Sequence, residues 1–253
     1  MKKIYIYLTA AVLFLIAGCS NNEDKTELYI LAAASLSDVM SEIEESYTNY
    51  SENTELIFNF SSSGRLRQQI MQGSPADIFL SASVEDMDSL EEEGAVLSRV
   101  NLLQNRLVLI ASMNHDFQYS SLNDLAGPET DSIAIGQPEL VPVGRYAEEA
   151  LRNAGVLDEI EEKIVYTNDT RQALTYAETG NVDTAVVYET DAGVSESVKV
   201  FDIIDESTYS PVYYPAGLLS EASSPAEAED FLEWLQSEEA SSIFEANGFT
   251  IFR

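Results

Sequence analysis

The stretch YILAAASLSDVM, residues 29–40, joins two kinds of local sequence. Its first three residues are typical of a buried strand, and three alanines follow them. From Ser35 onward, serine and aspartate open a segment whose apolar residues recur at helical spacing as far as Tyr50. A strand that passes directly into a helix is the repeating unit of an α/β fold. The free N–H groups at the start of such a helix are suited to binding an anion.

The rest of the chain repeats this alternation of short apolar strands and amphipathic helices. The pattern predicts an α/β fold with parallel sheets. The predicted strands cover 28–33, 55–60, 77–80, 106–111, 132–135, 163–166, 182–187, 199–203 and 211–219, and the predicted helices cover 36–50, 64–72, 84–93, 143–154, 169–179, 226–235 and 238–246.

The strands at 106–111 and 211–219 bracket the middle of the chain. We interpret this arrangement as one lobe inserted into another. Lobe 1 is predicted at 28–108 plus 213–253, and lobe 2 at 109–212. Two crossing strands would join the lobes. A ligand would then bind in the cleft between them, where the carboxyl ends of strands meet the starts of helices.

The N-terminal region is expected to lie outside the fold. Two lysines precede an apolar run at 4–16, which is too short to span a bilayer and predicts a signal peptide at 1–18. The run ends in IAGC, which resembles a bacterial lipobox, so we predict lipid attachment at Cys19. The alternative is an ordinary signal peptide with a chance cysteine. Residues 19–27 then form a lipid-attached linker, and the protein is expected to be extracytoplasmic and anchored to the cell membrane.

The chain is strongly acidic, with 44 Asp and Glu residues against 13 Lys and Arg residues and a formal net charge of −31. This balance argues against binding of nucleic acid, which requires a basic surface. One interpretation is an ordinary solvated acidic surface. We favour adaptation to high salt, where ions screen the repulsion between the carboxylates.

The sequence offers few residues for catalysis. The only histidine, His115, lies in a polar loop, and the chain contains neither a G-x-S-x-G motif nor a phosphate-binding P-loop. The single cysteine excludes an intrachain disulfide and, with one histidine, argues against a transition-metal site. We therefore predict that the protein is not an enzyme and has no cofactor and no metal cation. Calcium at an acidic loop is the alternative for a cation, although the sequence has no EF-hand spacing. The rival hypothesis is a lipoprotein enzyme that uses Ser63 as a nucleophile.

Four junctions between a strand and a helix carry donors for hydrogen bonds. They are Ser35, the SSSG motif at 61–64, the PVG motif at 142–144 and the NDT motif at 168–170. Each one alone is explained by helix capping. Together, on two predicted lobes, they indicate a shared cleft that binds an anion at several helix N-termini.

Five motifs carry a resemblance to a known family and occur in the family's order. They are AAASLSDVM, FSSSGRLRQQI with GSPADIFLSAS, GQPELVPVGRYAEEAL, TRQALTYAETGNVDTAVVYETDA and FEANGFTIF. With them the chain resembles the periplasmic molybdate-binding proteins of ABC importers from about residue 28 to residue 252. The resemblance implies a type II periplasmic-binding-protein fold, in which two α/β lobes joined by two crossing strands close on a tetrahedral oxyanion.

The family's ligand contacts carry over to five positions of this sequence. Ser35 and Ser63 match the donors of the first lobe. Val143 and Thr170 match positions that donate main-chain N–H groups from the second lobe. Tyr188 matches the phenol donor. The resemblance thus implies that these five residues bind the oxyanion.

The sequence departs from the family pattern at three of the junctions. The motif at 142–144 reads PVG where the family commonly has PAG, so a bulkier side chain stands beside the site. Gly64 and Arg65 replace the usual small hydroxyl residues, and Thr170 stands where an aliphatic residue is common. Three arginines near the junctions are expected to pair with surface carboxylates: Arg65, Arg145 and Arg171. The alternative is that they add positive potential near the cleft.

The resemblance implies a monomeric substrate-binding subunit that captures molybdate, with tungstate as a second ligand, and delivers it to an ABC permease in the membrane. A site made only of donors suits an oxyanion without a proton. The nearest alternative is the same fold with another oxyanion, such as sulfate or phosphate. A further alternative is a structural or sensory lipoprotein whose cleft no longer binds a ligand.

Overall fold

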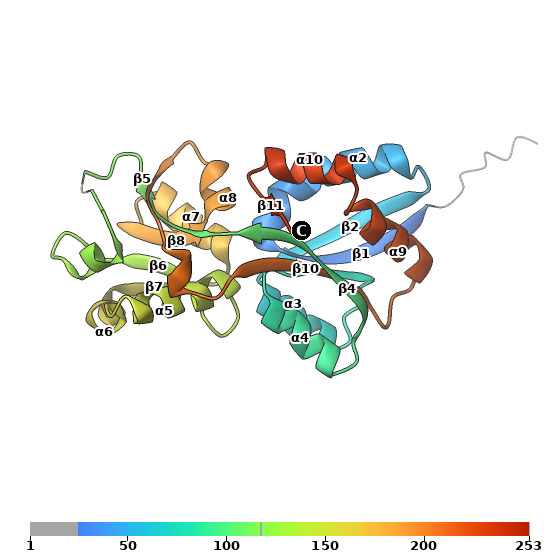
Figure 1. Cartoon of the computed structure of the whole chain (residues 1–253), viewed down its shortest axis with the longest axis horizontal. Coiled ribbons are helices and arrows are strands. Elements are labelled where there is room, and N and C mark those ends of the chain that lie inside the picture. Colours follow the sequence, from blue (N-terminus) through green and yellow to red (C-terminus); the bar gives the residue numbers. More distant parts are fainter. Residues whose placement is uncertain (1–24, 117, 253) are drawn as a thin grey trace, which may run out of the picture.

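The computed structural model describes residues 25–116 and 118–252 and forms two lobes side by side (Figure 1). The predicted signal peptide, Cys19 and most of the predicted linker lie outside the described residues. The first strand begins at Thr26, so the last two residues of the predicted linker, 26 and 27, belong to the fold.

The first lobe contains a six-stranded sheet with the order β11-β4-β10-β3-β1-β2. Helices α2, α9 and α10 lie on one face of this sheet, and α3 and α4 lie on the other (Figure 1). The strands are β1 (Thr26–Ala33), β2 (Thr54–Ser61), β3 (Ile78–Leu80), β4 (Val96–Asn105), β10 (Val212–Leu219) and β11 (Thr250–Ile251), and the helices are the 3₁₀ turn η1 (Ala34–Leu36), α2 (Ser37–Tyr50), α3 (Ser63–Met71), α4 (Val84–Glu92), α9 (Pro225–Trp234) and α10 (Glu238–Ala246).

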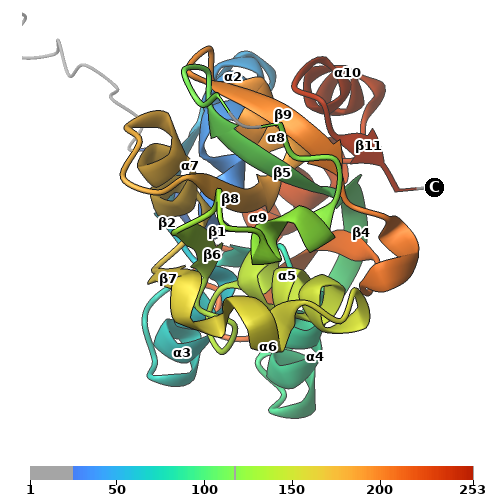
Figure 2. The same ribbon diagram turned by 90° about the vertical axis from the view of Figure 1, so that its left-hand side faces the viewer.

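The second lobe contains a five-stranded sheet with the order β7-β6-β8-β5-β9. Figure 2 looks onto this lobe, where α5 and α6 lie on one side of the strands and α7 and α8 on the other. The strands are β5 (Leu107–Ser112), β6 (Ile133–Gly136), β7 (Ile164–Thr167), β8 (Thr184–Tyr188) and β9 (Val198–Ile203), and the helices are η2 (Leu122–Ala126), α5 (Pro142–Asn153), α6 (Leu157–Ile160), η3 (Glu161–Lys163), α7 (Thr170–Glu178), α8 (Glu189–Gly193) and, on the return to the first lobe, η4 (Glu206–Thr208).

Two strand connections join the lobes. Strand β4 passes into β5 at Arg106, and β9 returns to β10 through residues 204–211 (Figure 1). The predicted fold class, two α/β lobes joined by two crossing strands, is therefore confirmed. The expectation of parallel sheets is wrong for the connecting strands, because β4 and β10 pair antiparallel, as β5 does with β8 and β9. A chain that crosses to the other lobe and back must run in opposite directions on the two crossings.

The apolar residues of β1 and α2 form much of the first lobe's core. Leu28, Ile30 and Ile43 are fully buried, as the periodicity of the sequence predicts. Tyr47, on the same helix, packs edge-on against Phe231 of α9 with 4.7 Å between ring centroids. This packing holds α2 across the sheet and keeps its N-terminal end, with η1, facing the second lobe.

Candidate functional site

All five predicted ligand residues line one cavity of about 210 Å³. They are Ser35, Ser63, Val143, Thr170 and Tyr188. The cavity lies between the lobes, where parallel strands of each sheet end and the next helices begin. The volume of about 210 Å³ includes space open to solvent, and the enclosed free volume is only about 10 Å³, far below the range of about 300–1,000 Å³ that is typical for drug-sized ligands. The arrangement therefore suits a small ligand held by converging helix N-termini.

The first lobe contributes two buried hydroxyl groups. Ser63 Oγ accepts a hydrogen bond of 2.9 Å from the main-chain N–H of Ala82. Since that bond occupies the oxygen as an acceptor, the Ser63 proton is free to point into the cavity. Ser35 Oγ lies 3.0 Å from the phenol oxygen of Tyr214, and the geometry allows either atom to be the donor.

The second lobe contributes main-chain donors. Val143 is the second residue of α5 and Thr170 is the first residue of α7, so neither N–H has an acceptor within its helix. The start of α5 packs closely against the end of β6, because a Cβ atom on Gly144 would lie 1.8 Å from the Gly136 oxygen. Only a glycine allows this contact. The bulkier Val143 side chain is buried in the main hydrophobic core while its residue lines the cavity.

Two hydroxyl groups at the cavity are buried and have no hydrogen-bond partner in the described structure. They belong to Tyr188 and Ser62. A buried hydroxyl without a partner costs about 1–3 kcal/mol, so each is expected to find one in a bound ligand. Burial first, and the neighbouring Tyr214 next, hold the pKa of Tyr188 well above its usual value, so the phenol keeps its proton as a donor.

Ser62 is a site residue that the sequence did not single out from its motif. It is the N-cap residue of α3, where a serine usually accepts a hydrogen bond from its own helix. Here that capping bond is absent, and the hydroxyl remains available to the cavity. The three consecutive serines at 61–63 signalled donors, but which of them face the cavity depends on the chain direction at the end of β2.

Asp191 lies behind the second-lobe donors and was also not predicted. Its side chain is fully buried, and Thr170 Oγ1 donates to its Oδ2 at 2.8 Å. Burial raises the pKa of Asp191 to about 6, while Arg171 and the Thr170 hydrogen bond oppose that rise. Arg171 Nε is 3.5 Å from the other carboxylate oxygen, which makes no hydrogen bond. The hydroxyl of Thr170 therefore serves the carboxylate, and only its main chain is free for a ligand.

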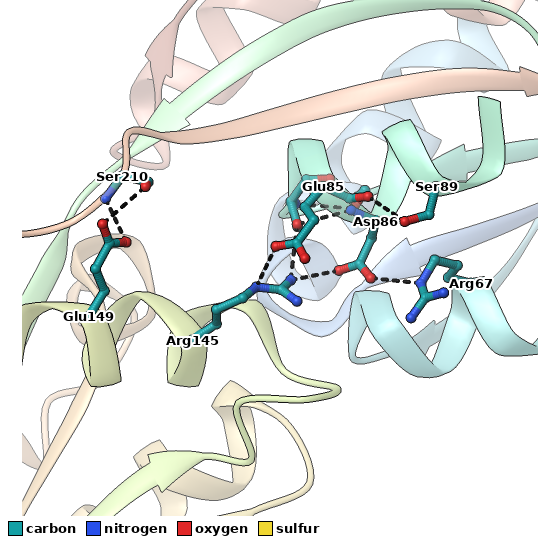
Figure 3. Close-up of polar contacts among 9 residues, drawn as sticks. Arg67, Glu85, Asp86, Ser89, Arg145, Glu149 and Ser210 are labelled. Carbon is teal, nitrogen blue, oxygen red and sulfur yellow. Dashed lines mark hydrogen bonds and ion pairs between the residues drawn. The ribbon is translucent and has the colours of Figure 1, made fainter. Parts of the chain in front are cut away.

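Contacts across the cleft hold the two lobes together in a closed arrangement. Gly64 N, at the start of α3, donates to Leu140 O of the second lobe at 3.0 Å. On the same side, Arg145 of α5 reaches Asp86 of α4 at 3.0 Å and Glu85 at 3.2 Å (Figure 3). Asp86 is buried, and Arg67 of its own lobe holds its other oxygen.

The other two arginines near the motifs also cross the cleft. Arg171 of the second lobe pairs with Asp38 of the first, and Arg65 of the first lobe donates to the Asn168 side chain of the second. The expected pairing with carboxylates is therefore confirmed for Arg145 and Arg171. It is wrong for Arg65, which bonds an amide oxygen. All three pairs join one lobe to the other, which the sequence did not predict.

Comparison with known proteins shows which family the chain belongs to. The family described as bacterial extracellular solute-binding protein matches residues 28–250. The chain belongs to this family. "Putative ABC transporter substrate-binding lipoprotein YvgL" of Bacillus subtilis (strain 168) is 41% identical over 98% of both chains. "Molybdate-binding protein ModA" of Haemophilus influenzae is 33% identical over 99% of both chains. The resemblance inferred from the motifs is thus confirmed.

A solved structure supports the same assignment of the fold. The periplasmic molybdate-binding protein of Azotobacter vinelandii superposes with a TM-score of 0.80, covers 89% of this chain and 100% of its own, and is 24% identical. At this identity the likeness establishes the fold alone. The two-lobed arrangement of this solute-binding protein is therefore the arrangement of a solved structure with little sequence in common.

The remaining candidates for catalysis or metal binding are His115, Ser63 and clusters of possible metal ligands. His115 stacks on Tyr119 at 5.6 Å between ring centroids, beside Phe201 of β9. The side-chain oxygen of Ser63 is held by a main-chain N–H rather than by a basic side chain. Over residues 25–116 and 118–252, no group of three or more His, Cys, Asp and Glu side chains is placed to hold a metal ion.

Proposed function

We propose that the protein is the substrate-binding subunit of an ABC importer that captures molybdate, and also tungstate, for delivery to a membrane permease. The observation that carries the proposal is the cavity at the starts of α3, α5 and α7, with the unpartnered hydroxyls of Tyr188 and Ser62. The one carboxylate among the described residues that line it, Asp169, accepts a hydrogen bond from Gln172 N as the N-cap of α7. The names of the relatives, an ABC transporter lipoprotein and ModA molybdate-binding proteins, support it.

The chemistry of the cavity suits a fully deprotonated oxyanion. Ser35, Ser63 and Tyr188 supply hydroxyl donors, and Val143 and Thr170 supply main-chain N–H groups. Molybdate is a dianion without a proton, and charge-assisted hydrogen bonds from neutral donors bind it without a counter-charge. Monohydrogen phosphate would bring an O–H to these five donors, and an O–H left without an acceptor costs about 1–3 kcal/mol. Sulfate carries no proton either, so the size of the cavity must separate it from molybdate.

The proposal includes an extracytoplasmic location and no catalysis. Family membership, as an extracellular solute-binding protein, supports the location. The lipid anchor at Cys19 rests on the IAGC sequence and on the name of the B. subtilis relative. Among residues 25–116 and 118–252, no helix is long and apolar enough to cross a membrane. Within the described part of the chain, the hydrogen-bond partner of Ser63 Oγ is a main-chain N–H and not the basic side chain that a serine nucleophile needs, which supports a binding role.

Calorimetric titration of the mature protein with molybdate, tungstate, sulfate and phosphate tests the ligand. We expect molybdate and tungstate to bind much more tightly than sulfate, and phosphate to bind most weakly. Equal affinity for sulfate and molybdate would overturn the ligand assignment. Binding of no oxyanion would overturn the proposed function.

The substitution Ser63→Ala tests the cavity itself. Removal of one donor to a charged ligand should weaken molybdate binding by about 10- to 100-fold, or roughly 1.5–3 kcal/mol. Ser61→Ala is the matched control, because Ser61 belongs to the same motif but does not line the cavity. An equal effect of the two substitutions would contradict the assigned role of Ser63.

A further inference from the structure

A chain of hydrogen bonds runs from a strand that connects the lobes to the cavity. Asn105 is the last residue of β4, and Tyr214 lies on β10, the returning strand. Asn105 Nδ2 lies 3.3 Å from the phenol oxygen of Tyr214, which in turn lies 3.0 Å from Ser35 Oγ. Tyr214 and Ser35 are both buried, so water does not compete for these bonds.

The hydrogen bond from the Arg106 N–H to Asn105 determines the direction of every later hydrogen bond in this series. The main-chain N–H of Arg106 donates to Asn105 Oδ1 at 2.9 Å, which identifies the other amide atom as Nδ2. That nitrogen has two protons and no acceptor capacity. It donates one proton to Thr190 Oγ1 at 2.8 Å and the other to Tyr214. The Tyr214 oxygen therefore accepts from Asn105.

The same reasoning determines the direction of the hydrogen bond between Tyr214 and Ser35. Tyr214 has a single proton, and Ser35 Oγ is the acceptor that remains for it. Burial holds the pKa of Tyr214 far above its usual value, so the phenol keeps that proton. Ser35 then accepts from Tyr214, and its own proton is free to point into the cavity.

We propose that Asn105 and Tyr214 are positioning residues that commit the Ser35 hydroxyl to donate into the cavity. The inference rests on the proposed function and explains its selectivity. The Ala82 N–H orients Ser63 in the same way, so both first-lobe serines have their protons free to donate to a ligand. The site thereby selects the protonation state of its ligand, binding a tetrahedral oxyanion without a proton and rejecting one that carries an O–H.

The substitution Asn105→Asp replaces the Nδ2 donor with an oxygen acceptor, and it thereby reverses the direction of the hydrogen bonds from Asn105 to Ser35. A carboxylate oxygen in place of Nδ2 accepts from Tyr214, so the Tyr214 oxygen must accept from Ser35. The lone pairs of Ser35 then face the cavity. At pH 8, we expect molybdate affinity to fall by about 100-fold and the preference for molybdate over phosphate to fall by at least about tenfold. Both ligands are mainly dianions at this pH, so the added charge alone leaves that ratio unchanged.

Asn101→Asp is the matched control, because it adds the same charge on β4 at a residue outside the cavity. Tyr214→Phe tests the chain without a new charge, and Tyr213→Phe is its control on the same strand. We expect Tyr214→Phe to free the Ser35 hydroxyl and to lower the molybdate-to-phosphate ratio by at least about threefold. This variant carries the test if Asn105→Asp fails to fold.

The outcomes separate the two proposals. Wild-type protein that binds no oxyanion overturns the proposed function, and this inference with it. Wild-type protein that prefers molybdate, with Asn105 and Tyr214 variants that lose affinity for both ligands equally, overturns this inference alone. In that case the two residues would have only a structural role.

Discussion

The hydroxyl of Thr170 donates to a carboxylate buried behind the cavity, while the residue lines the cavity and its main-chain N–H has no acceptor within α7. At this position the main chain is available to a ligand, so the identity of the side chain matters less for binding. The family commonly has an aliphatic residue there. The hydroxyl in this chain donates to Asp191, whose nearest positive charge, Arg171 Nε, lies 3.5 Å from its other oxygen without a hydrogen bond. Burial therefore holds the pKa of this carboxylate above its usual value.

The raised pKa of Asp191 predicts a stability that depends on pH. The folded state binds a proton with a pKa of about 6, while the ordinary value is 3.8, so the folded state holds more protons between these values. Stability from this group is present below pH 4 and is lost as the pH rises to 6, by roughly 3 kcal/mol in total. The side chain of the Asp191→Asn variant does not titrate, so its contribution to stability does not change over this pH range.

Chemical unfolding of wild type and Asp191→Asn between pH 4 and pH 7 measures this effect. The free energy of unfolding of the variant should rise relative to wild type as the pH rises through this interval. A constant difference between the two proteins across the interval would show that Asp191 keeps an ordinary pKa.

At the scale of elements, the start of α3 is shaped for contact with the other lobe. Gly64 stands where the family usually has a small hydroxyl residue, and the sequence offered no reason for it. In the structure, a Cβ atom at this position would lie 2.6 Å from Leu140 O. The glycine therefore allows the two main chains to meet across the cleft, where Gly64 N donates to that oxygen.

Gly64→Ala should keep the lobes apart. Because the clash is with main-chain atoms, it cannot be relieved by rotating a side chain. We expect molybdate affinity to fall by about tenfold or more, since the closed state becomes less populated. Small-angle X-ray scattering should show less compaction on adding ligand. Gly193→Ala is the control, because its Cβ would meet no atom within 4 Å. Normal compaction of Gly64→Ala would refute this role.

The elements that the sequence predicted were those with clear periodicity. The apolar run of β5 and the one-sided helix α2 were found nearly to the residue. Strand β4 was missed, because Val96–Asn105 is half-exposed and its polar and apolar residues do not alternate. Its pairing with β10 decides that it is a strand, and that partner lies more than a hundred residues further along the chain.

At the scale of the whole molecule, charged side chains join the lobes around the cavity. Arg145 is the most connected of them, since it reaches Asp86, Glu85 and Ser83 of the first lobe (Figure 3). The carboxylate of Asp86 remains paired with Arg67 when Arg145 is removed. The contact therefore stabilises the closed arrangement without being required for folding of the first lobe.

Arg145→Gln should weaken closure and leave stability nearly unchanged. Loss of a partly buried ion pair should lower molybdate affinity by about fivefold, or roughly 1 kcal/mol, with faster dissociation. Stopped-flow fluorescence measures the rate. Arg152→Gln is the control, because Arg152 of the same helix pairs with Glu148 within that helix. The difference should shrink in high salt. An equal effect of both variants would argue against a closing role.

The net charge of −31 predicts that salt stabilises the fold. At 0.1 M salt, repulsion between surface carboxylates more than about 10 Å apart is largely screened, and this distance shortens as more salt is added. The free energy of unfolding should therefore rise as NaCl is added. Sodium chloride is the suitable salt, because sulfate stabilises proteins through its own exclusion from the surface. Stability that stays flat, or falls, with added NaCl would contradict the hypothesis of adaptation to high salt.

The sequence by itself determined the α/β class, the two lobes, the family and the five residues that meet in one cavity. The class and the lobes follow from local periodicity, which is a property of neighbouring residues. The five residues follow from the resemblance of the motifs to the family. Only the tertiary structure decided that Ser62 faces the cavity, that Thr170 bonds Asp191, and that Asn105 and Tyr214 direct Ser35. Hydrogen-bond direction depends on partners that are distant in sequence, such as Ser35 and Tyr214, and folding alone brings them within 3.0 Å.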